Sequence, residues 1–323
     1  MPEEERPLQQ QQRSRDIQIM HSNDETVETK LQRIAEKAGR DPECRFTSLF
    51  HLVDKELLLG CFNALKEGKA SGIDRITKEQ YAGNLMENLD DLIGRLHRMA
   101  YIPQPVLRVY IPKAGSKKMR PLGIPALEDK LVQAALSKIL QAIYEQDFID
   151  DSYGFRPNRS CHDALRIINQ TITGKGTNYI VEADIKGFFD NVDQDELMEF
   201  LAHRIADKRV LRYIKRFLKS GIHEEGVFRA SEKGTPQGGV ISPVLANLYL
   251  HYTLDLWFQR KYLKTCTGTA RLIRYADDFV VCFKQEADAK RFRIEMEKRL
   301  NQYGLEIAPE KTKILEFGPQ AQK

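Results

Sequence analysis

Two short β-prone runs, residues 272–273 and 279–283, flank the polar step at residues 274–278. Such an arrangement predicts a hairpin with Asp277 and Asp278 at its tip. Neighbouring side chains of a continuous strand point to opposite faces, so adjacent aspartates fit a bend better than a ladder. Two carboxylates about 4 Å apart repel by roughly 4 kcal/mol at an effective dielectric near 20, so they need a proton, a cation or full solvation. Taken alone, an Asp-Asp pair more often marks an exposed acidic turn than a site.

The composition of the chain limits what can surround this hairpin. The 323 residues are 41% hydrophobic and 30% charged, which is enough for one large core or two smaller ones. No apolar run approaches the roughly 20 residues that span a bilayer, and the acidic start is unlike a signal peptide. We therefore expect a cytoplasmic protein without a membrane partner. The scattered cysteines and unpaired histidines argue against a disulfide scaffold and a zinc site.

The formal net charge of +4 is distributed unevenly. Residues 1–29 hold seven acids and three bases, a net of −4, which leaves +8 on residues 30–323. Residues 92–127 contain seven Lys or Arg and no acid. That distribution suits a polyanion such as nucleic acid, and equally a solvated basic face. A glutamine run at residues 9–12 and few apolar residues predict that residues 1–29 form a disordered leader.

Helical and strand-like patterns are interspersed along the rest of the chain without an internal repeat, which predicts an α+β fold. Apolar residues recur at helical spacing in several segments between residues 30 and 99, and again in 126–148, 242–258 and 286–303. Ser160, Asp193 and Ser242 are placed to cap helices. Residues 106–125 indicate a hairpin with a basic bend that includes Lys117 and Lys118. This bend could bind phosphate or merely face solvent.

Two loops carry residues of chemical interest. Residues 153–160 interleave aromatic side chains with Arg156 and Arg159, a composition able to stack on bases and bind phosphates. Taken alone, this loop fits packing aromatics and surface arginines better. Residues 234–239 form a Gly-rich loop, in which glycines allow unusual dihedrals and close backbone approach. A tight turn before a helix would explain the second loop equally.

Asp184 ends the strand-like run 179–185, a common location for a metal ligand and also for a capping turn. Asp184 and Asp277 lie far enough apart in the sequence to come from different strands of one sheet. Two magnesium ions about 3.5 to 4 Å apart need carboxylates from separate strands, together with substrate phosphates. With the basic hairpin upstream, this set fits nucleotidyl transfer.

An ordered series of motifs resembles the reverse transcriptase domain of bacterial group II intron-encoded proteins, the intron maturases. The motifs are Ile111-Pro112-Lys113, Arg120-Pro121-Leu122-Gly123-Ile124-Pro125, Tyr153-Gly154-Phe155-Arg156-Pro157, Asp184-Ile185-Lys186-Gly187-Phe188-Phe189-Asp190, Gly234-Thr235-Pro236-Gln237-Gly238-Gly239-Val240-Ile241-Ser242-Pro243 and Tyr275-Ala276-Asp277-Asp278. The resemblance covers the chain from about residue 30 to its end. A lone Asp-Asp is weak support, whereas this ordered set is very specific.

The resemblance implies a right-hand polymerase fold. Residues 30–178 would form the fingers with an N-terminal extension, and residues 179–323 the palm with the catalytic hairpin and a helical insertion near 205–233. Members of the family continue into a primer grip and a helical thumb, and this chain stops at Lys323 without them. We therefore expect a fragment or truncation with the thumb absent from the chain, an intact metal site and weak processive synthesis.

The resemblance also implies an activity and its partners. The chain would be an RNA-directed DNA polymerase that uses an intron RNA template, a DNA primer or target DNA, and dNTPs, and that binds intron RNA to support splicing and mobility. Two Mg²⁺ ions would serve as cofactors, with Mn²⁺ able to substitute. Homodimerisation stays open.

Individual roles follow from the motifs by resemblance. Asp184 and Asp277 would hold the metal ions with the main chain of Ile185, and Asp278 would support the site. The residues expected at the nucleotide are Lys113, Arg120, Phe189 (as an aromatic gate against a ribose 2′-hydroxyl), Gln237 and Lys311 (as a proton donor to pyrophosphate). Those expected at nucleic acid are Arg156, Arg159, Lys117 and Lys118.

Two other interpretations remain. One is a non-catalytic RNA-binding splicing maturase whose palm is only scaffold, although an intact set of Asp184, Asp277 and Asp278 argues against such decay. The other is a CRISPR-linked or other group II-like reverse transcriptase, which shares these motifs.

Overall fold

The computed structural model describes residues 26–112, 119–174, 176–235 and 238–318. Its α-helices are α2 (Val27–Arg40), α3 (Lys55–Ala64), α4 (Lys78–Ala82), α5 (Leu85–His97), α6 (Leu127–Tyr144), α7 (Cys161–Thr173), α8 (Phe188–Asn191), α9 (Gln194–Arg204), α10 (Lys208–Leu218), α11 (Ser242–Leu250) and α12 (Glu286–Asn301). Its strands are β1 (Val106–Pro112), β2 (Met119–Ile124), β3 (Tyr179–Ala183), β4 (Ile222–Glu224), β5 (Val227–Arg229), β6 (Ala270–Tyr275), β7 (Asp278–Phe283) and β8 (Lys313–Glu316).

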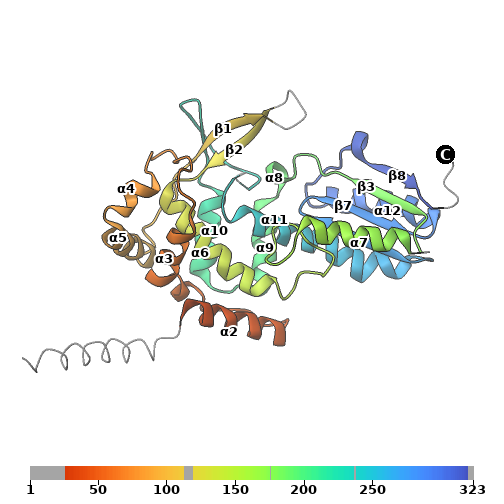
Figure 1. Ribbon diagram of the computed structural model, residues 1–323, viewed down its shortest axis with the longest axis horizontal. Coiled ribbons are helices and arrows are strands. Elements are labelled where there is room, and N and C mark those ends of the chain that lie inside the picture. Colours follow the sequence, from red (N-terminus) through yellow and green to blue (C-terminus); the bar gives the residue numbers. More distant parts are fainter. Residues whose placement is uncertain (1–25, 113–118, 175, 236–237, 319–323) are drawn as a thin grey trace, which may run out of the picture.

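The molecule is elongated, with a helix-rich lobe at one end and a sheet-based lobe at the other (Figure 1). Helices α3, α4 and α5 lie in the first lobe below the hairpin of β1 and β2, whereas α12 and strands β3, β7 and β8 lie in the second. Helices α8, α9 and α11 stand between them. One large apolar core extends from α2 to α12 through these central helices.

The sheet of the first lobe has the strand order β2-β1-β4-β5. Strands β1 and β2 pair antiparallel, from Leu107 opposite Ile124 to Pro112 opposite Met119, which confirms the hairpin expected at residues 106–125. Strand β4 joins β1 in parallel, although more than a hundred residues separate them. The segment 205–233, expected as a helical insertion of the palm, is therefore helical only in α10, and its strands complete the sheet of the other lobe.

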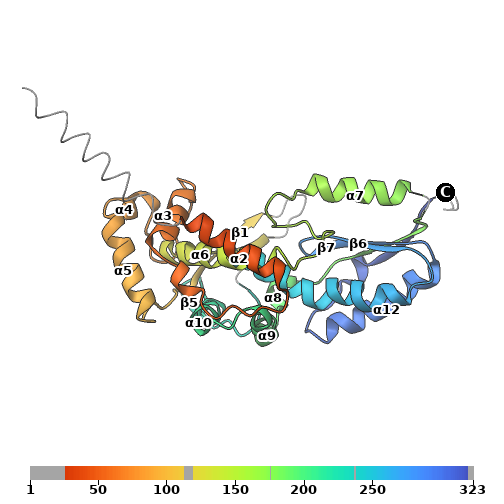
Figure 2. The same cartoon turned by 90° about the horizontal axis from the view of Figure 1, so that it is seen from below.

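The sheet of the second lobe has the order β6-β7-β3-β8, with every neighbouring pair antiparallel. Helices α7 and α12 lie on opposite sides of it (Figure 2). Alternate strand residues face each helix: Ile273 and Cys282 join Ala164 of α7 in a small cluster, while Val181 and Phe283 belong to the main core with α12. Helix α7, within the range expected for the fingers, thus packs on the sheet expected for the palm.

Several helix boundaries follow from side-chain caps. Ser160 and Asp163 form a reciprocal capping box at α7, and Asp193 accepts hydrogen bonds from two backbone amides at α9, as the sequence predicts. Ser242 is instead the first residue of α11, which Ile241 precedes without a side-chain cap. Helix α2 begins at Val27, inside the last residues of the expected leader. Among the described residues, no helix is both long and apolar enough to cross a membrane.

Helix α11 continues into an unusual segment. After Leu250 the chain forms two π-helical turns, His251–Asp255 and Phe258–Tyr262, followed by a 3₁₀ turn, Leu263–Thr265. A π turn inserts one extra residue and rotates the side chains around it, and such turns are frequent at functional sites. Here the first of them carries Asp255 into the core, with no solvent exposure.

Candidate active site

The expected acidic hairpin is present. Tyr275 of β6 pairs with Asp278 of β7, so Ala276 and Asp277 form a two-residue turn. Ala276 has a φ of 57°, a left-handed conformation that non-glycine residues rarely adopt. The two aspartates are therefore not equivalent, because Asp277 lies in the turn and Asp278 begins a strand.

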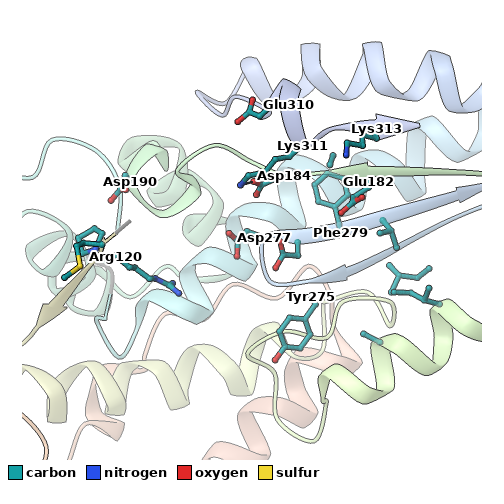
Figure 3. A pocket seen from close by; sticks show the side chains of 18 residues that line it. Arg120, Glu182, Asp184, Asp190, Tyr275, Asp277, Phe279, Glu310, Lys311 and Lys313 are labelled. Atoms are coloured by element: carbon teal, nitrogen blue, oxygen red, sulfur yellow. Dashed lines mark hydrogen bonds and ion pairs between the residues drawn. The ribbon is translucent and has the colours of Figure 1, made fainter. Parts of the chain in front are cut away.

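Asp184 follows directly after β3, which pairs with β7 so that Ala183 lies opposite Phe279. This register brings Asp184 beside the turn of the hairpin, as the sequence predicted for ligands from separate strands. Figure 3 shows Asp184 and Asp277 facing one cavity. The cavity has a volume of about 930 Å³. Its polar lining residues are Arg120, Glu182, Asp184, Asp190, Tyr275, Asp277, Asp278, Glu310, Lys311 and Lys313.

Two carboxyl groups at this cavity, those of Asp277 and Asp278, have raised pKa values. Burial raises the pKa of Asp277, and the negative charge of Asp184 raises it further, whereas Arg120 and Arg274 lower it. Partial desolvation raises the pKa of Asp278, and Asp277 and Asp184 add to that rise. Both effects disfavour the ionised forms and would be relieved by a bound cation.

Lys311 already contacts this acidic group. It ends the 3₁₀ turn Pro309–Lys311, and its ammonium donates a hydrogen bond to Oδ2 of Asp184. That bond raises the pKa of Lys311, and the negative charge of Asp184 raises it further. Figure 3 shows the two side chains together at the edge of the cavity. A metal ion bound at this oxygen would therefore compete with the lysine.

The main chain of Ile185 was also expected, by resemblance, to supply an oxygen ligand. Ile185 lies opposite Ile307 in an antiparallel bridge whose hydrogen bonds are made by Asp184 O with Ala308 N and by Lys186 N with Glu306 O. The carbonyl of Ile185 consequently points away from that partner segment. In the described parts of the chain, no three His, Cys, Asp or Glu side chains cluster as metal ligands. Two carboxylates and a carbonyl fit magnesium if substrate phosphates and water supply the remaining oxygens.

Arg120 belongs to β2 of the other lobe and reaches toward Asp277 across the cavity (Figure 3). Its side chain is exposed, and its charge acts on Asp277. Both features suit a contact with an anionic group bound in the cavity. Lys113, Lys117 and Lys118, the other cations expected near this hairpin, lie outside the described residues, as does Gln237.

The Gly-rich loop joins Phe189 to the first lobe. Thr235 donates its backbone N–H to the carbonyl of Phe189 at 2.8 Å. A Cβ on Gly234 (φ +78°) would lie 2.6 Å from that same carbonyl, and one on Gly238 (φ +99°) would lie 2.2 Å from the carbonyl of Gly123 in β2. Glycine is therefore required on both sides of the loop. Phe189 is half-buried beside the cavity-lining Asp190, and its ring packs edge-on against Phe188.

The structure speaks against the prediction that Arg156 contacts nucleic acid. Its side chain is 2% exposed and forms a salt bridge with Glu145 at 2.9 Å. Its guanidinium also donates to the carbonyls of Ile149 and Ser152, at 2.7 and 2.8 Å. Because these donors are used inside the protein, Arg156 fastens the loop that precedes α7 and cannot reach a phosphate. Arg159 stays partly exposed, held by Asp150 and stacked over the ring of Tyr153.

The sequence interpretation assigned no role to several residues that the structure brings to the cavity. Asp190 and Tyr275 lie within the quoted motifs and line the cavity. Glu310, beside Lys311, also lines the cavity. Asp190 and Tyr275 could have been identified from their motifs. Glu310 could not, because the irregular turn that places it has no periodic pattern.

Comparisons with known proteins support the family resemblance seen in the sequence. Residues 111–321 match the family described as reverse transcriptase (RNA-dependent DNA polymerase). The chain is 41% identical over 222 residues to the group II intron-encoded protein LtrA of Lactococcus lactis subsp. cremoris, an alignment that covers 68% of this chain and 37% of that protein. It is 35% identical over 289 residues to the protein YkfC of Escherichia coli K12, covering 79% of this chain and 76% of that protein.

Among solved structures, telomerase from Candida albicans in complex with a fragment of telomeric RNA has a similar fold. The TM-score is 0.54 at 14% identity, and the match covers 76% of this chain and 47% of that one. At this identity the likeness concerns the fold alone, and it is consistent with the expected right-hand polymerase fold. The chain thus spans little more than a third of the length of the Lactococcus protein and about three quarters of the Escherichia protein.

Proposed function

This chain belongs to the reverse transcriptase family, as a relative of group II intron-encoded proteins, and we propose that it is the polymerase part of such a protein. It would copy RNA into DNA by adding deoxynucleotides to a DNA primer. The observation that carries the proposal is the position of Asp184 and Asp277, from two paired strands, in one cavity opposite Arg120. Reverse transcriptases generally use divalent metal ions, and these oxygen ligands fit magnesium.

The residues of the cavity have distinct roles in this proposal. Asp184, Asp277 and the carbonyl of Ile185 would hold two Mg²⁺ ions, and Asp278 would set the local charge. When bound, such ions lower the pKa of the primer 3′-hydroxyl and neutralise the leaving pyrophosphate. Lys311, which contacts Asp184, would protonate that pyrophosphate.

Nucleotide recognition would come from the lobe opposite the aspartates. Arg120 would bind the triphosphate with a charge-assisted hydrogen bond, together with Lys113. Phe189 would exclude a ribose 2′-hydroxyl, and Gln237 would line the nucleotide pocket. The glycines on either side of Gln237 support this idea, because Gly234 lies against Phe189 and Gly238 against β2.

The partners proposed for this chain are intron RNA, a DNA primer or target DNA, and dNTPs. The names of its relatives and the net charge of +8 on residues 30–323 support intron RNA as the template and as a ligand in splicing. A steep fall of RNA affinity with salt would indicate phosphate contacts, because bound phosphates release counterions. A shallow slope would argue against this part of the proposal.

The test is nucleotide incorporation on an RNA template with a DNA primer. We expect incorporation in Mg²⁺ that Asp277→Ala abolishes while RNA affinity stays at the level of the parent protein. If a version with the full length of its relatives incorporates nothing, the polymerase proposal fails and a non-catalytic RNA-binding maturase is favoured. The raised pKa values of Asp277 and Asp278 speak against that alternative, since a scaffold gains nothing from crowded carboxylates.

A further inference from the structure

A fully buried charged residue lies next to the catalytic turn. Arg274, in β6, is 0% exposed, and so is Asp255, its partner from the π-helical turn after α11. Nε of Arg274 donates to Oδ1 of Asp255 at 2.9 Å, and Nη2 donates to Oδ2 at 2.5 Å. The pair therefore has the two-bond geometry that fixes a guanidinium in one plane.

The remaining arm of Arg274 reaches the turn itself. Nη1 donates to the backbone carbonyl of Ala276 at 2.9 Å and to Oδ1 of Asn247 at 2.9 Å. Ala276 is the residue before Asp277 and has the positive φ noted above. A backbone in this conformation persists only when its surroundings hold it. The guanidinium is thus one element that holds it.

Asn247 connects the same guanidinium to the loop before α7. Its Nδ2 donates to the carbonyl of Gly154 at 2.7 Å, while the backbone N–H of Tyr153 donates to the carbonyl of Arg274 at 2.8 Å. One buried cluster thereby joins the hairpin, the helix that follows the Gly-rich loop, and the loop at residues 153–156. The hairpin and the loop carry two of the quoted motifs, and the helix begins with the last two residues of a third, Ser242 and Pro243.

Stability alone does not account for this cluster. A buried ion pair can often be replaced by apolar residues of similar volume at little cost, because taking two charges out of water offsets their attraction. An apolar pair would nevertheless leave the Ala276 carbonyl without its donor. The guanidinium therefore orients the turn more than it stabilises the fold.

We propose that Arg274, fixed by Asp255 and Asn247, is a positioning residue that holds the Ala276 carbonyl and so aims the Asp277 carboxylate toward Asp184 for metal binding. This inference rests on the proposed function for its catalytic meaning. It predicts that a variant that folds without the guanidinium binds metal more weakly and has a less rigid turn.

The test compares the double variant Arg274→Met/Asp255→Leu with a matched pair on the same strand. Arg271 forms a two-bond salt bridge with Asp151, at 2.8 and 2.7 Å, and lines a different cavity. Arg271→Met/Asp151→Leu therefore removes a pair with the same two-bond geometry, 42% and 23% exposed, away from the cavity of the aspartates. The probe is Mn²⁺ alone, titrated by electron paramagnetic resonance, together with amide hydrogen exchange at residues 275–278 in metal-free protein.

We expect Arg274→Met/Asp255→Leu to melt within a few degrees of the parent, to bind Mn²⁺ at least tenfold more weakly, and to exchange the turn amides at least tenfold faster. The control pair should leave both quantities unchanged. Turn exchange equal to that of the parent in the folded double variant would overturn the proposal, as would an equal effect of the control pair.

Arg274→Lys keeps the test decisive if the double variant does not fold. Lysine keeps the charge beside Asp255 but cannot also hold both Asn247 and Ala276, so faster exchange of the turn is again expected. Exchange equal to that of the parent would overturn the proposal. Because neither readout needs nucleic acid, failure of nucleotide incorporation in the parent protein would count against the proposed function and not against this inference.

Discussion

Gly154 lies so close to Ala276 that a Cβ added to it would be 2.3 Å from the backbone nitrogen of Ala276. No side chain fits at that distance. The loop before α7 therefore packs directly against the turn at Ala276 and Asp277, and a small change in this loop should move Asp277.

We expect Gly154→Ala to reduce nucleotide incorporation at least tenfold, because the turn must shift to admit the new methyl group. Overpacking of this kind typically costs about 1–3 kcal/mol of unfolding free energy. Primer extension and denaturant unfolding measure the two effects. Gly60→Ala in α3 is the control, since outside its own stretch of helix no described atom lies within 4 Å of a Cβ there, and it should leave activity intact. Normal extension by Gly154→Ala would contradict the close packing.

Asp277 and Asp278 should differ in importance. We expect Asp277→Asn to lower incorporation by about a thousandfold or more, as loss of a metal ligand does, and Asp278→Asn to lower it about ten- to a hundredfold. Single-turnover primer extension at saturating metal separates the two. Equal losses would show that the two carboxylates share the metal equally.

The raised pKa values of these aspartates predict a pH effect on stability. Where folding raises a carboxyl pKa, the folded state binds protons more strongly than the unfolded state between the ordinary and the raised pKa. The unfolding free energy contributed by Asp277 and Asp278 should therefore decrease as pH rises through that window in metal-free protein. Urea unfolding from pH 3 to 7, compared with Asp277→Asn/Asp278→Asn, isolates this contribution. A difference between the two proteins that does not vary with pH would refute it.

Lys311 should have opposite effects on metal binding and on chemistry. Because its ammonium occupies Oδ2 of Asp184, we expect Lys311→Met to bind Mn²⁺ more tightly. Its maximal incorporation rate should fall about tenfold or more if the lysine protonates pyrophosphate. Lys311→Arg, which keeps the charge, should bind Mn²⁺ no more tightly than the parent protein does. A Lys311→Met variant with the full rate at all pH values would exclude the proton-donor role.

We expect Arg156 to affect stability and Arg159 to affect RNA binding. Arg156→Met leaves Glu145 without its buried partner, and breaking such a pair typically costs about 3–5 kcal/mol. Arg159→Met should cost little stability and should lower RNA affinity, with a smaller salt slope. Denaturant unfolding and RNA binding at several salt concentrations distinguish the two. A stable Arg156→Met protein with weakened RNA binding would restore the original expectation for this residue.

The local patterns of the sequence predicted the parts of the site that depend on neighbours along the chain. The hairpin at Asp277 follows from two β-prone runs, and the location of Asp184 follows from the end of a strand. Both predictions need only the alternation of side chains along a strand and the length of the β-prone runs. The antiparallel register of β3 and β7, which brings the two aspartates together, fits that expectation.

Interactions between distant residues were not predictable in this way. Arg156 beside aromatic residues looks the same in sequence whether it meets a phosphate or Glu145, because the partner comes from the end of another helix. Asp255 lies within an apolar helical pattern. Its salt bridge to Arg274 depends on a π turn that the spacing of residues in the sequence does not predict. The pairing of β4 with β1 was missed for the same reason, since it joins segments with no local signal.

That parallel pairing of β1 with β4 has a consequence for biosynthesis. The sheet of the first lobe lacks its second half until residues 222–229 have left the ribosome, by which time β3 of the other lobe has already emerged. Contacts of such long sequence separation slow folding and leave strand edges open in the meantime. The two lobes are therefore not successive folding units of the nascent chain. A ribosome stalled after residue 178 should present a protease-sensitive N-terminal lobe, even though that segment already contains β1 and β2.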